Sequence, residues 1–142
     1  MHKNYWLFKT EPDAFSVDDL ANMPNQTEHW DGIRNYQARN FLRDDVKVGD
    51  LVFIYHSSCQ EVGIAGVAEV VKEGYVDHTQ FDPESKYYDP KSAPEKPRWY
   101  MVDVKLVRKF DRILSLKSIK FMPQITQIGL VKKGHRLSIM PV

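Results

Sequence analysis

The chain has 142 residues, a single cysteine and a formal net charge of +1. This length fits one domain over residues 1–142 with a buried core. The lone Cys59 excludes an internal disulfide and any multi-cysteine metal site, so we expect neither a metal nor a cofactor. The apolar run at residues 5–8 is too short for a signal peptide or a membrane span, which favours a cytoplasmic protein without a membrane partner.

The charge is divided unevenly along the chain. Residues 1–97 hold ten Lys or Arg against seventeen Asp or Glu, whereas residues 98–142 hold ten against two. The two parts therefore carry formal charges of −7 and +8. Such a division predicts one basic surface that meets phosphates, unless the two halves neutralise each other across the fold.

The first third of the chain predicts one strand and two helices. Residues 5–9 are expected to form a strand that ends before Pro12, because proline lacks a backbone donor. Ser16 is typical of a helix N-cap, and residues 23–28 are expected to form a polar loop. Residues 34–46 predict an amphipathic helix, since three apolar side chains share one face: Ala38, Phe41 and Leu42.

Further strands are expected at residues 51–55, 63–71, 99–110 and 137–140, from their β-branched and aromatic content. Gly66 inside the second of these indicates a bulge or a close backbone approach. Ser115 is a candidate N-cap for a short helix over residues 116–121.

A loop over residues 77–97 is longer than compact domains usually contain, which favours a binding role. It carries the aromatic residues Phe81, Tyr87 and Tyr88. Together with Trp30 these rings are expected to clamp a flat heterocycle, although single rings in such a loop also serve as anchors to the core.

The stretch over residues 30–40 combines aromatic rings, guanidinium groups and carboxamides around Gly32. Rings stack on planar ligands, and amides and guanidinium groups bind their edges. Trp30 is expected to be a pocket ring that the core does not need, so Trp30→Ala is expected to abolish binding with the fold mostly intact. A Trp buried in the core is the alternative.

Residues 55–59 place His56 beside two serines, yet no Gly-x-Ser-x-Gly motif surrounds them, which argues against a Ser hydrolase. His56 and Cys59 have no further His or Cys at ligand spacing, so no zinc site is expected. Lys9, Thr10 and Glu11 are able to bind a ligand edge or to act in acid–base catalysis. Because they are consecutive in a strand, alternation is expected to turn Thr10 away from its two neighbours.

In this order, the segments 6–12, 30–40, 55–57, 87–89, 97–99 and 136–138 closely resemble the EVE domain family. The resemblance implies an α+β, PUA-like fold, with a small curved β-barrel of about five to six strands flanked by short helices. EVE domains are similar to YTH domains, which hold a methylated adenine in an aromatic cage, and are associated with modified cytosines in nucleic acid.

The residues and the resemblance together predict a non-enzymatic module that binds nucleic acid, DNA or RNA, and reads a modified base, with a modified cytosine favoured. The predicted pocket consists of Lys9, Thr10, Glu11, Trp30, Asn35, Tyr55, His56, Ser57, Tyr87, Tyr88 and Trp99. The predicted phosphate contacts are Arg34, Arg39, Arg98, Lys132, Lys133 and Arg136.

Two other functions stay open. ASCH domains, which are also PUA-like, include amidohydrolases of acylated cytidine that use Lys, Thr and Glu, the residue types at positions 9–11. A protein–protein module that uses the long loop fits the aromatic content, but it leaves the basic half of the chain unexplained.

Overall fold

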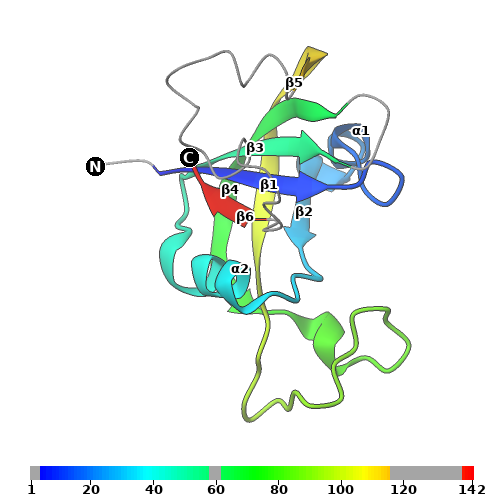
Figure 1. The fold of residues 1–142 in the computed structure, drawn as a ribbon, viewed down its shortest axis with the longest axis vertical. Coiled ribbons are helices and arrows are strands. Elements are labelled where there is room, and N and C mark those ends of the chain that lie inside the picture. The colour runs from blue at the N-terminus through cyan, green and yellow to red at the C-terminus, as the bar shows by residue number, and fades with distance from the viewer. Residues whose placement is uncertain (1–3, 58–61, 116–138) are drawn as a thin grey trace.

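The computed structural model describes residues 4–57, 62–115 and 139–142. Within these ranges six strands form one sheet in the order β2-β5-β4-β3-β1-β6 (Figure 1). Their bounds are β1 Tyr5–Thr10, β2 Thr27–Trp30, β3 Leu51–His56, β4 Gly63–Val76, β5 Tyr100–Ser115 and β6 Ile139–Pro141. The helical elements are α1 Val17–Ala21, η1 Pro24–Gln26, α2 Tyr36–Asn40, η2 Phe41–Asp45 and η3 His78–Phe81.

The sheet is mixed and strongly curved. β1 pairs with β3 in parallel and all other described pairs are antiparallel. In Figure 1 β1 and β3 run across the view while β5 runs nearly along the long axis. Among the described strands the sheet stays open between its edges β2 and β6. The expected α+β class, with about five to six strands and short helices, is confirmed.

Two apolar clusters cover the two faces of the sheet. Alternation along β1 sends Trp6 and Phe8 into the larger cluster and Leu7 into the smaller one. The larger cluster also contains Leu20 of α1, Ala38 of α2 and Leu42 of η2, so these short helices are held by the burial of one face.

Gly66 lies beside a bulge, as predicted. The registers of β3 with β4 and of β4 with β5 both shift next to it. A Cβ at Gly66 would lie 2.7 Å from the carbonyl oxygen of Arg108, so only glycine lets the two backbones approach this closely.

The expected polar loop at residues 23–28 is wrong in part, because the edge strand β2 begins at Thr27. β2 pairs only with β5 and buries only Trp30, so it lacks the apolar alternation by which a strand is recognised. The single helix expected over residues 34–46 is two elements, since η2 continues α2 as a π-helical turn. Asn35 caps α2.

No helix in the described ranges is long and apolar enough to cross a bilayer. The same residues contain no group of three or more His, Cys, Asp or Glu that is placed to hold a metal ion. The helix expected at 116–121 and Cys59 lie outside the described residues.

Candidate functional site

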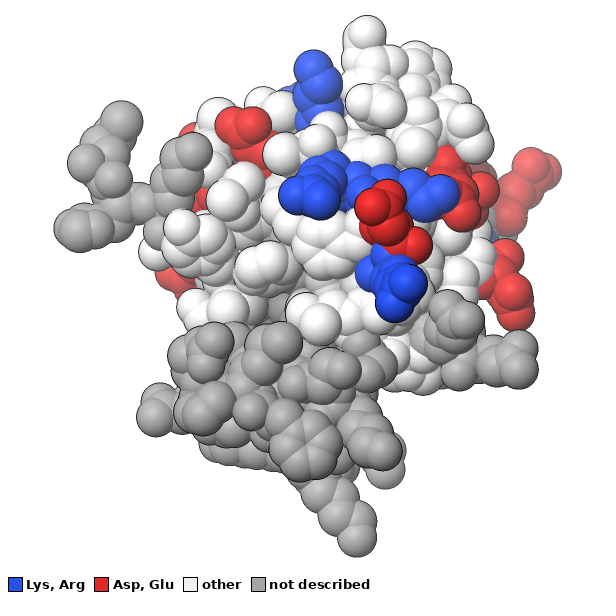
Figure 2. All heavy atoms as spheres, turned by 90° about the horizontal axis from the view of Figure 1, so that it is seen from above, with Lys and Arg blue, Asp and Glu red and all other residues white. Residues whose placement is uncertain are grey.

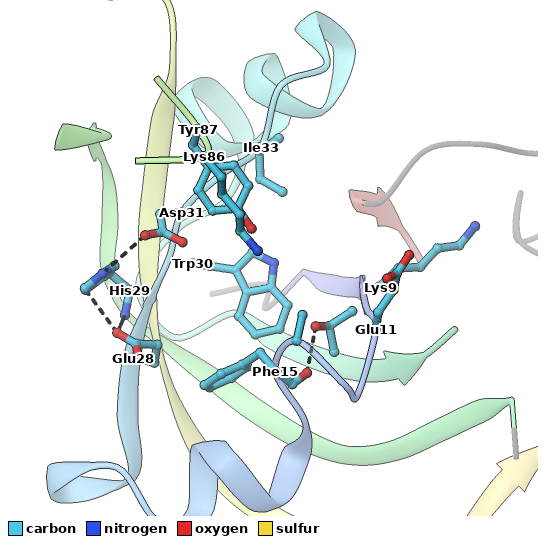
Figure 3. Close-up of a pocket in the computed structure, with 13 residues that line it drawn as sticks. Lys9, Glu11, Phe15, Glu28, His29, Trp30, Asp31, Ile33, Lys86 and Tyr87 are labelled. Atoms are coloured by element: carbon cyan, nitrogen blue, oxygen red, sulfur yellow. Dashed lines mark hydrogen bonds and ion pairs between the residues drawn. The ribbon is translucent and has the colours of Figure 1, made fainter. Parts of the chain in front are cut away.

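A cavity of about 610 Å³ opens at the end of β1, which is within the usual range for small-ligand sites (Figure 3). Segments distant in sequence build its walls: the end of β1 and the turn after it, β2 and the three residues after it, and the loop that follows η3. Its described lining residues are Lys9, Thr10, Glu11, Ala14, Phe15, Glu28, His29, Trp30, Asp31, Gly32, Ile33, Lys86 and Tyr87.

Trp30 belongs both to this cavity and to the core. Its side chain is only 7% exposed, and its ring centroid lies 5.5 Å from that of Phe8 and 5.9 Å from that of Phe15. The expectation that Trp30 is a pocket ring which the core does not need is therefore wrong. The core positions the indole, and one part of it is left to line the cavity.

Tyr87 brings a second ring to the cavity from the long loop (Figure 3). The ring lies directly over Gly32, where a Cβ would come within 2.5 Å of the Tyr87 Cζ atom. Gly32 also has a φ of +77°, a conformation that L side chains rarely adopt. Glycine is thus required here both for the backbone turn and for the position of the tyrosine ring.

Arg34 fastens the loop in this position. Its guanidinium donates five hydrogen bonds, two of them to the carbonyl oxygen of Tyr87, at 3.0 and 2.7 Å, and one to Asp77, at 3.0 Å. The same guanidinium lies 5.6 Å from the ring centroid of Tyr87. We call Gly32, Arg34, Asp77 and Tyr87 the clasp. Arg34 has all five donors engaged and none left for a phosphate.

Asp77 is the buried carboxylate at the centre of the clasp. Burial by itself would raise the pKa of Asp77, but hydrogen bonds from Thr79, from the Gly32 amide and from Arg34 outweigh burial and lower it. The Gly32 amide donates to Oδ2 at 2.9 Å. The carboxylate therefore joins the segment after β2 to the start of the loop.

Three polar residues line the edge of the cavity beside the clasp: Glu28, His29 and Asp31. We call them the acidic rim. His29 lies between the two carboxylates, with Nδ1 3.0 Å from Glu28 Oε1 and Nε2 3.4 Å from Asp31 Oδ2. Burial raises the pKa of Asp31; nearby Asp77 and Glu28 raise it further, and His29 opposes them. The rim keeps unused hydrogen-bonding capacity.

Lys9, Thr10 and Glu11 all line the cavity, and the expected separation of the Thr10 side chain from its two neighbours stays a prediction. The strand ends at Thr10, and the chain turns at once, with the amides of Ala14 and Phe15 both donating to the Glu11 carbonyl at 2.9 Å. The Thr10 hydroxyl donates to the Phe15 carbonyl at 2.7 Å. Burial lowers the pKa of Lys9.

The cavity thus brings together five of the predicted pocket residues: Lys9, Thr10, Glu11, Trp30 and Tyr87. It does not include Asn35, whose Oδ1 accepts the Ala38 amide at the start of α2. It also omits Tyr55, which is buried in the smaller cluster on the other face of the sheet. Both side chains take structural positions.

Four further predicted pocket residues lie outside the lining. His56 Nε2 accepts the Val17 amide at 3.0 Å, which holds α1 against β3, and burial lowers the pKa of this histidine. The Ser57 amide donates to the carbonyl of Thr10. Tyr88 is 42% exposed, and Trp99 is buried, with Nε1 donating to Asp89.

The predicted phosphate contacts are placed as follows. Arg34 is engaged in the clasp, and Arg39 donates to the carbonyl of Arg98 at 2.7 Å and to Asn40. Arg98 reaches the Tyr36 hydroxyl at 3.3 Å. The other three, Lys132, Lys133 and Arg136, lie outside the described residues.

β5 carries a set of exposed cations that the sequence analysis did not select for phosphate binding: Lys105, Arg108, Lys109 and Arg112. Lys109 pairs with Asp18 of α1. Figure 2 looks down on the upper end of the view in Figure 1 and shows Lys and Arg side chains gathered there, with acidic side chains beside them.

Sequence reasoning missed the acidic rim and Phe15. Asp31 lies inside the stretch over residues 30–40, but it was not among the predicted pocket residues. Glu28 and His29 fell in the expected polar loop. Recognising β2 would have revealed the three residues of the acidic rim, because a strand that ends at Trp30 places the residues next to Trp30 at the same edge of the sheet.

The model of the EVE domain matches residues 4–142. The chain belongs to the EVE domain family. It is 50% identical to thymocyte nuclear protein 1 of Danio rerio over 124 residues, which cover 81% of this chain and 53% of the relative. It is 48% identical to the human protein of that name over 155 residues, covering 98% and 68%. The chain thus spans about half to two thirds of these curated relatives.

The fold agrees with solved structures of the family. The crystal structure of human THYN1 protein in complex with 5-methylcytosine-containing DNA superposes with a TM-score of 0.91 at 43% identity, covering 99% of this chain and 91% of that one. The PUA-like fold expected from the sequence is confirmed, with the described strands forming a curved, open sheet.

Proposed function

We propose that this protein is a non-enzymatic reader that binds nucleic acid and takes a modified base, 5-methylcytosine above all, into the cavity between Trp30 and Tyr87. The observation that carries the proposal is the cavity itself, which has two aromatic walls and an acidic rim. The human THYN1 complex with 5-methylcytosine-containing DNA supports the choice of base, because that protein shares this fold at 43% identity.

The energies favour such a pocket. Removing a base from its stack costs a few kcal/mol. Stacking against aromatic side chains contributes about 1–3 kcal/mol per base, and burying one methyl group adds about 0.8 kcal/mol. The methyl group alone therefore gives modest selectivity, so the shape and the polar walls of the cavity must supply the rest.

The proposal includes the absence of catalysis, although Lys9, Thr10 and Glu11 meet at one cavity. The Thr10 hydroxyl already donates a hydrogen bond to the Phe15 carbonyl oxygen at 2.7 Å, so its proton is engaged within the protein and not directed at a ligand. Prolonged incubation with an acylated cytidine, followed by chromatography, is expected to return the substrate unchanged. Deacylation that is lost in Glu11→Gln would instead support the amidohydrolase function.

The test of binding compares two adjacent tyrosines. Tyr87 lines the cavity, whereas Tyr88 does not and is exposed. We expect Tyr87→Ala to weaken binding of an oligonucleotide with one 5-methylcytosine about 5- to 100-fold, because one stacking wall is lost. Tyr88→Ala is the matched control and is expected to bind like wild type. Equal affinities of the two variants, measured by calorimetry, would refute the proposed pocket.

Phosphate contacts from Lys132, Lys133 and Arg136, and a cytoplasmic location, are further parts of this proposal. Each neutralised phosphate contributes about −0.7 to −0.9 to the slope of log affinity against log salt. Charge reversal at Lys132 and Lys133 is expected to flatten that slope without changing binding of a free nucleoside. Cell fractionation tests the location.

A further inference from the structure

Three carboxylates line the described part of the cavity, and their surroundings differ. Glu11 lies in the turn after β1 and is exposed. Glu28 is engaged, because its Oε1 accepts the His29 amide at 2.8 Å and lies 3.0 Å from His29 Nδ1. Asp31 has 27% of its side chain exposed, its own backbone amide hydrogen-bonds the carboxylate, and its contact with His29 Nε2 is the longer of the two rim contacts, at 3.4 Å. Asp31 is thus a partly buried carboxylate that keeps capacity to accept a further hydrogen bond.

The histidine reinforces this difference between the two rim carboxylates. The imidazole of His29 lies 3.0 Å from Glu28 and 3.4 Å from Asp31. The longer contact makes the hydrogen bond from the ring to Asp31 the weaker of the two. In Figure 3 the Asp31 carboxylate is drawn below Tyr87 and to the left of the Trp30 indole, on the side that faces His29.

An ionised carboxylate only accepts hydrogen bonds, so it selects a base edge by its donors. Cytosine and 5-methylcytosine carry an amino donor at N4, and aspartate is a usual partner for it. Thymine has the same 5-methyl group but an oxygen at that position. Facing Asp31, that oxygen would place two acceptors together without a proton, which disfavours thymine.

On the basis of the proposed function, we propose that Asp31 is the specificity-determining residue of this cavity, where its carboxylate accepts a hydrogen bond from the exocyclic amino group of the bound base. The cavity accordingly takes 5-methylated bases that carry an amino group at C4 and rejects those that carry an oxygen there. Trp30 and Tyr87 provide affinity for any flat ring, while Asp31 tells 5-methylcytosine from thymine.

The experiment uses the full chain and four single-stranded DNA oligonucleotides that differ only at one central base: 5-methylcytosine, cytosine, thymine or uracil. Single strands leave no base pair to open, so the affinities report the cavity alone. Wild type is expected to prefer 5-methylcytosine to thymine about 10- to 100-fold, the range for one charge-assisted hydrogen bond. Asp31→Asn, whose amide donates as well as accepts, is expected to reduce that preference to about threefold or less. Asp44→Asn is the matched control and is expected to keep it, because Asp44 is exposed and lies outside the cavity.

Each outcome has one meaning. A wild type that binds thymine as well as 5-methylcytosine would overturn the role of Asp31 without any variant, so the test does not depend on the folding of Asp31→Asn. A preference that survives in folded Asp31→Asn would also overturn it. The proposed function fails separately, if wild type binds 5-methylcytosine no better than unmodified cytosine.

Discussion

The clasp and the acidic rim adjoin each other at Asp31 and Gly32, yet their polar groups behave in opposite ways. In the clasp, Asp77 is fully buried and holds several hydrogen bonds, which lower its pKa in spite of burial. In the rim, Asp31 is partly buried, and burial raises its pKa although His29 and its own backbone amide oppose the rise. Only one glycine-containing turn separates Asp31 from Arg34, the residue that satisfies Asp77.

This difference shows how to tell whether a charged residue in a predicted binding stretch holds the site together or is available to bind a ligand. Arg34 has the chemistry of a phosphate ligand, but its five donors are all engaged within the protein, so it holds the loop and has no donor left for a phosphate. Asp31 has the chemistry of a turn residue, but it keeps capacity to accept a further hydrogen bond and it lines the cavity. Satisfied groups build a site, and unsatisfied ones are available for binding.

The largest effect is expected at Trp30, on which both regions depend. We expect Trp30→Ala to lower the free energy of unfolding by about 3–5 kcal/mol, the usual cost of emptying a buried aromatic site. Urea denaturation measures it. Trp30→Phe is the control and should lose less, because a ring remains against Phe8 and Phe15. A stable Trp30→Ala that has lost binding would mean that the core does not need this ring.

The next effect is expected at Arg34. Arg34→Met leaves the buried Asp77 carboxylate without its ionic partner, and we expect a loss of about 3 kcal/mol, at the low end for such pairs because Arg34 is 22% exposed. Arg43→Met is the matched control, since the Arg43–Asp44 pair is exposed and should contribute nothing measurable. If the two variants are equally stable, Arg34 is free to contact phosphates, as the sequence predicted.

A smaller effect on stability is expected at two glycines with positive φ, and binding should distinguish them. Gly32 and Gly49 have φ values of +77° and +95°, but a Cβ at Gly49 meets nothing within 4 Å. Both alanine variants are expected to lose about 1–2 kcal/mol from backbone strain. Only Gly32→Ala should also weaken binding of 5-methylcytosine, because the new methyl group displaces the Tyr87 ring. Thermal melting and calorimetry of both variants check this. Equal affinities of the two variants for 5-methylcytosine would show that the Tyr87 ring does not contact the base.

The smallest expected effect is a difference between the pKa values of Asp31 and Asp77, with Asp77 titrating at the lower pH. Carboxyl-carbon NMR is expected to show Asp31 titrating above its usual 3.8 and Asp77 below it. Asp77 then adds stability that is present above pH 3.8 and is lost as the pH falls through its folded pKa. Asp31 has the opposite effect, because its folded pKa is raised. Above that pKa its ionised form lowers stability, and this loss disappears as the pH falls through the folded pKa.

The titratable groups around Asp31 are His29, Glu28 and Asp77, and Lys86 lines the same cavity. Asp31→Asn and Asp77→Asn assign the two signals, since each removes one resonance. The reverse order of midpoints would contradict the distinction between clasp and rim.

The sequence was sufficient for the strands with strong apolar patterns and for the family, because those signals are local. It was insufficient for β2, whose four residues bury one side chain and depend on β5 for pairing. It indicated Trp30 and left the loop ring open between Tyr87 and Tyr88, while His56 and Asn35 proved to be capping groups for helices. Partners distant in sequence decide which polar residue is satisfied, and no local pattern contains that information.

The most direct test of the central claim is an NMR spectrum of an oligonucleotide that carries one ¹³C-methyl-labelled 5-methylcytosine, recorded with and without the protein. If the base enters between Trp30 and Tyr87, ring currents should move its methyl resonance upfield on binding, and Tyr87→Ala but not Tyr88→Ala should reduce the shift. A methyl resonance that stays at its free position while the oligonucleotide is bound would contradict the account.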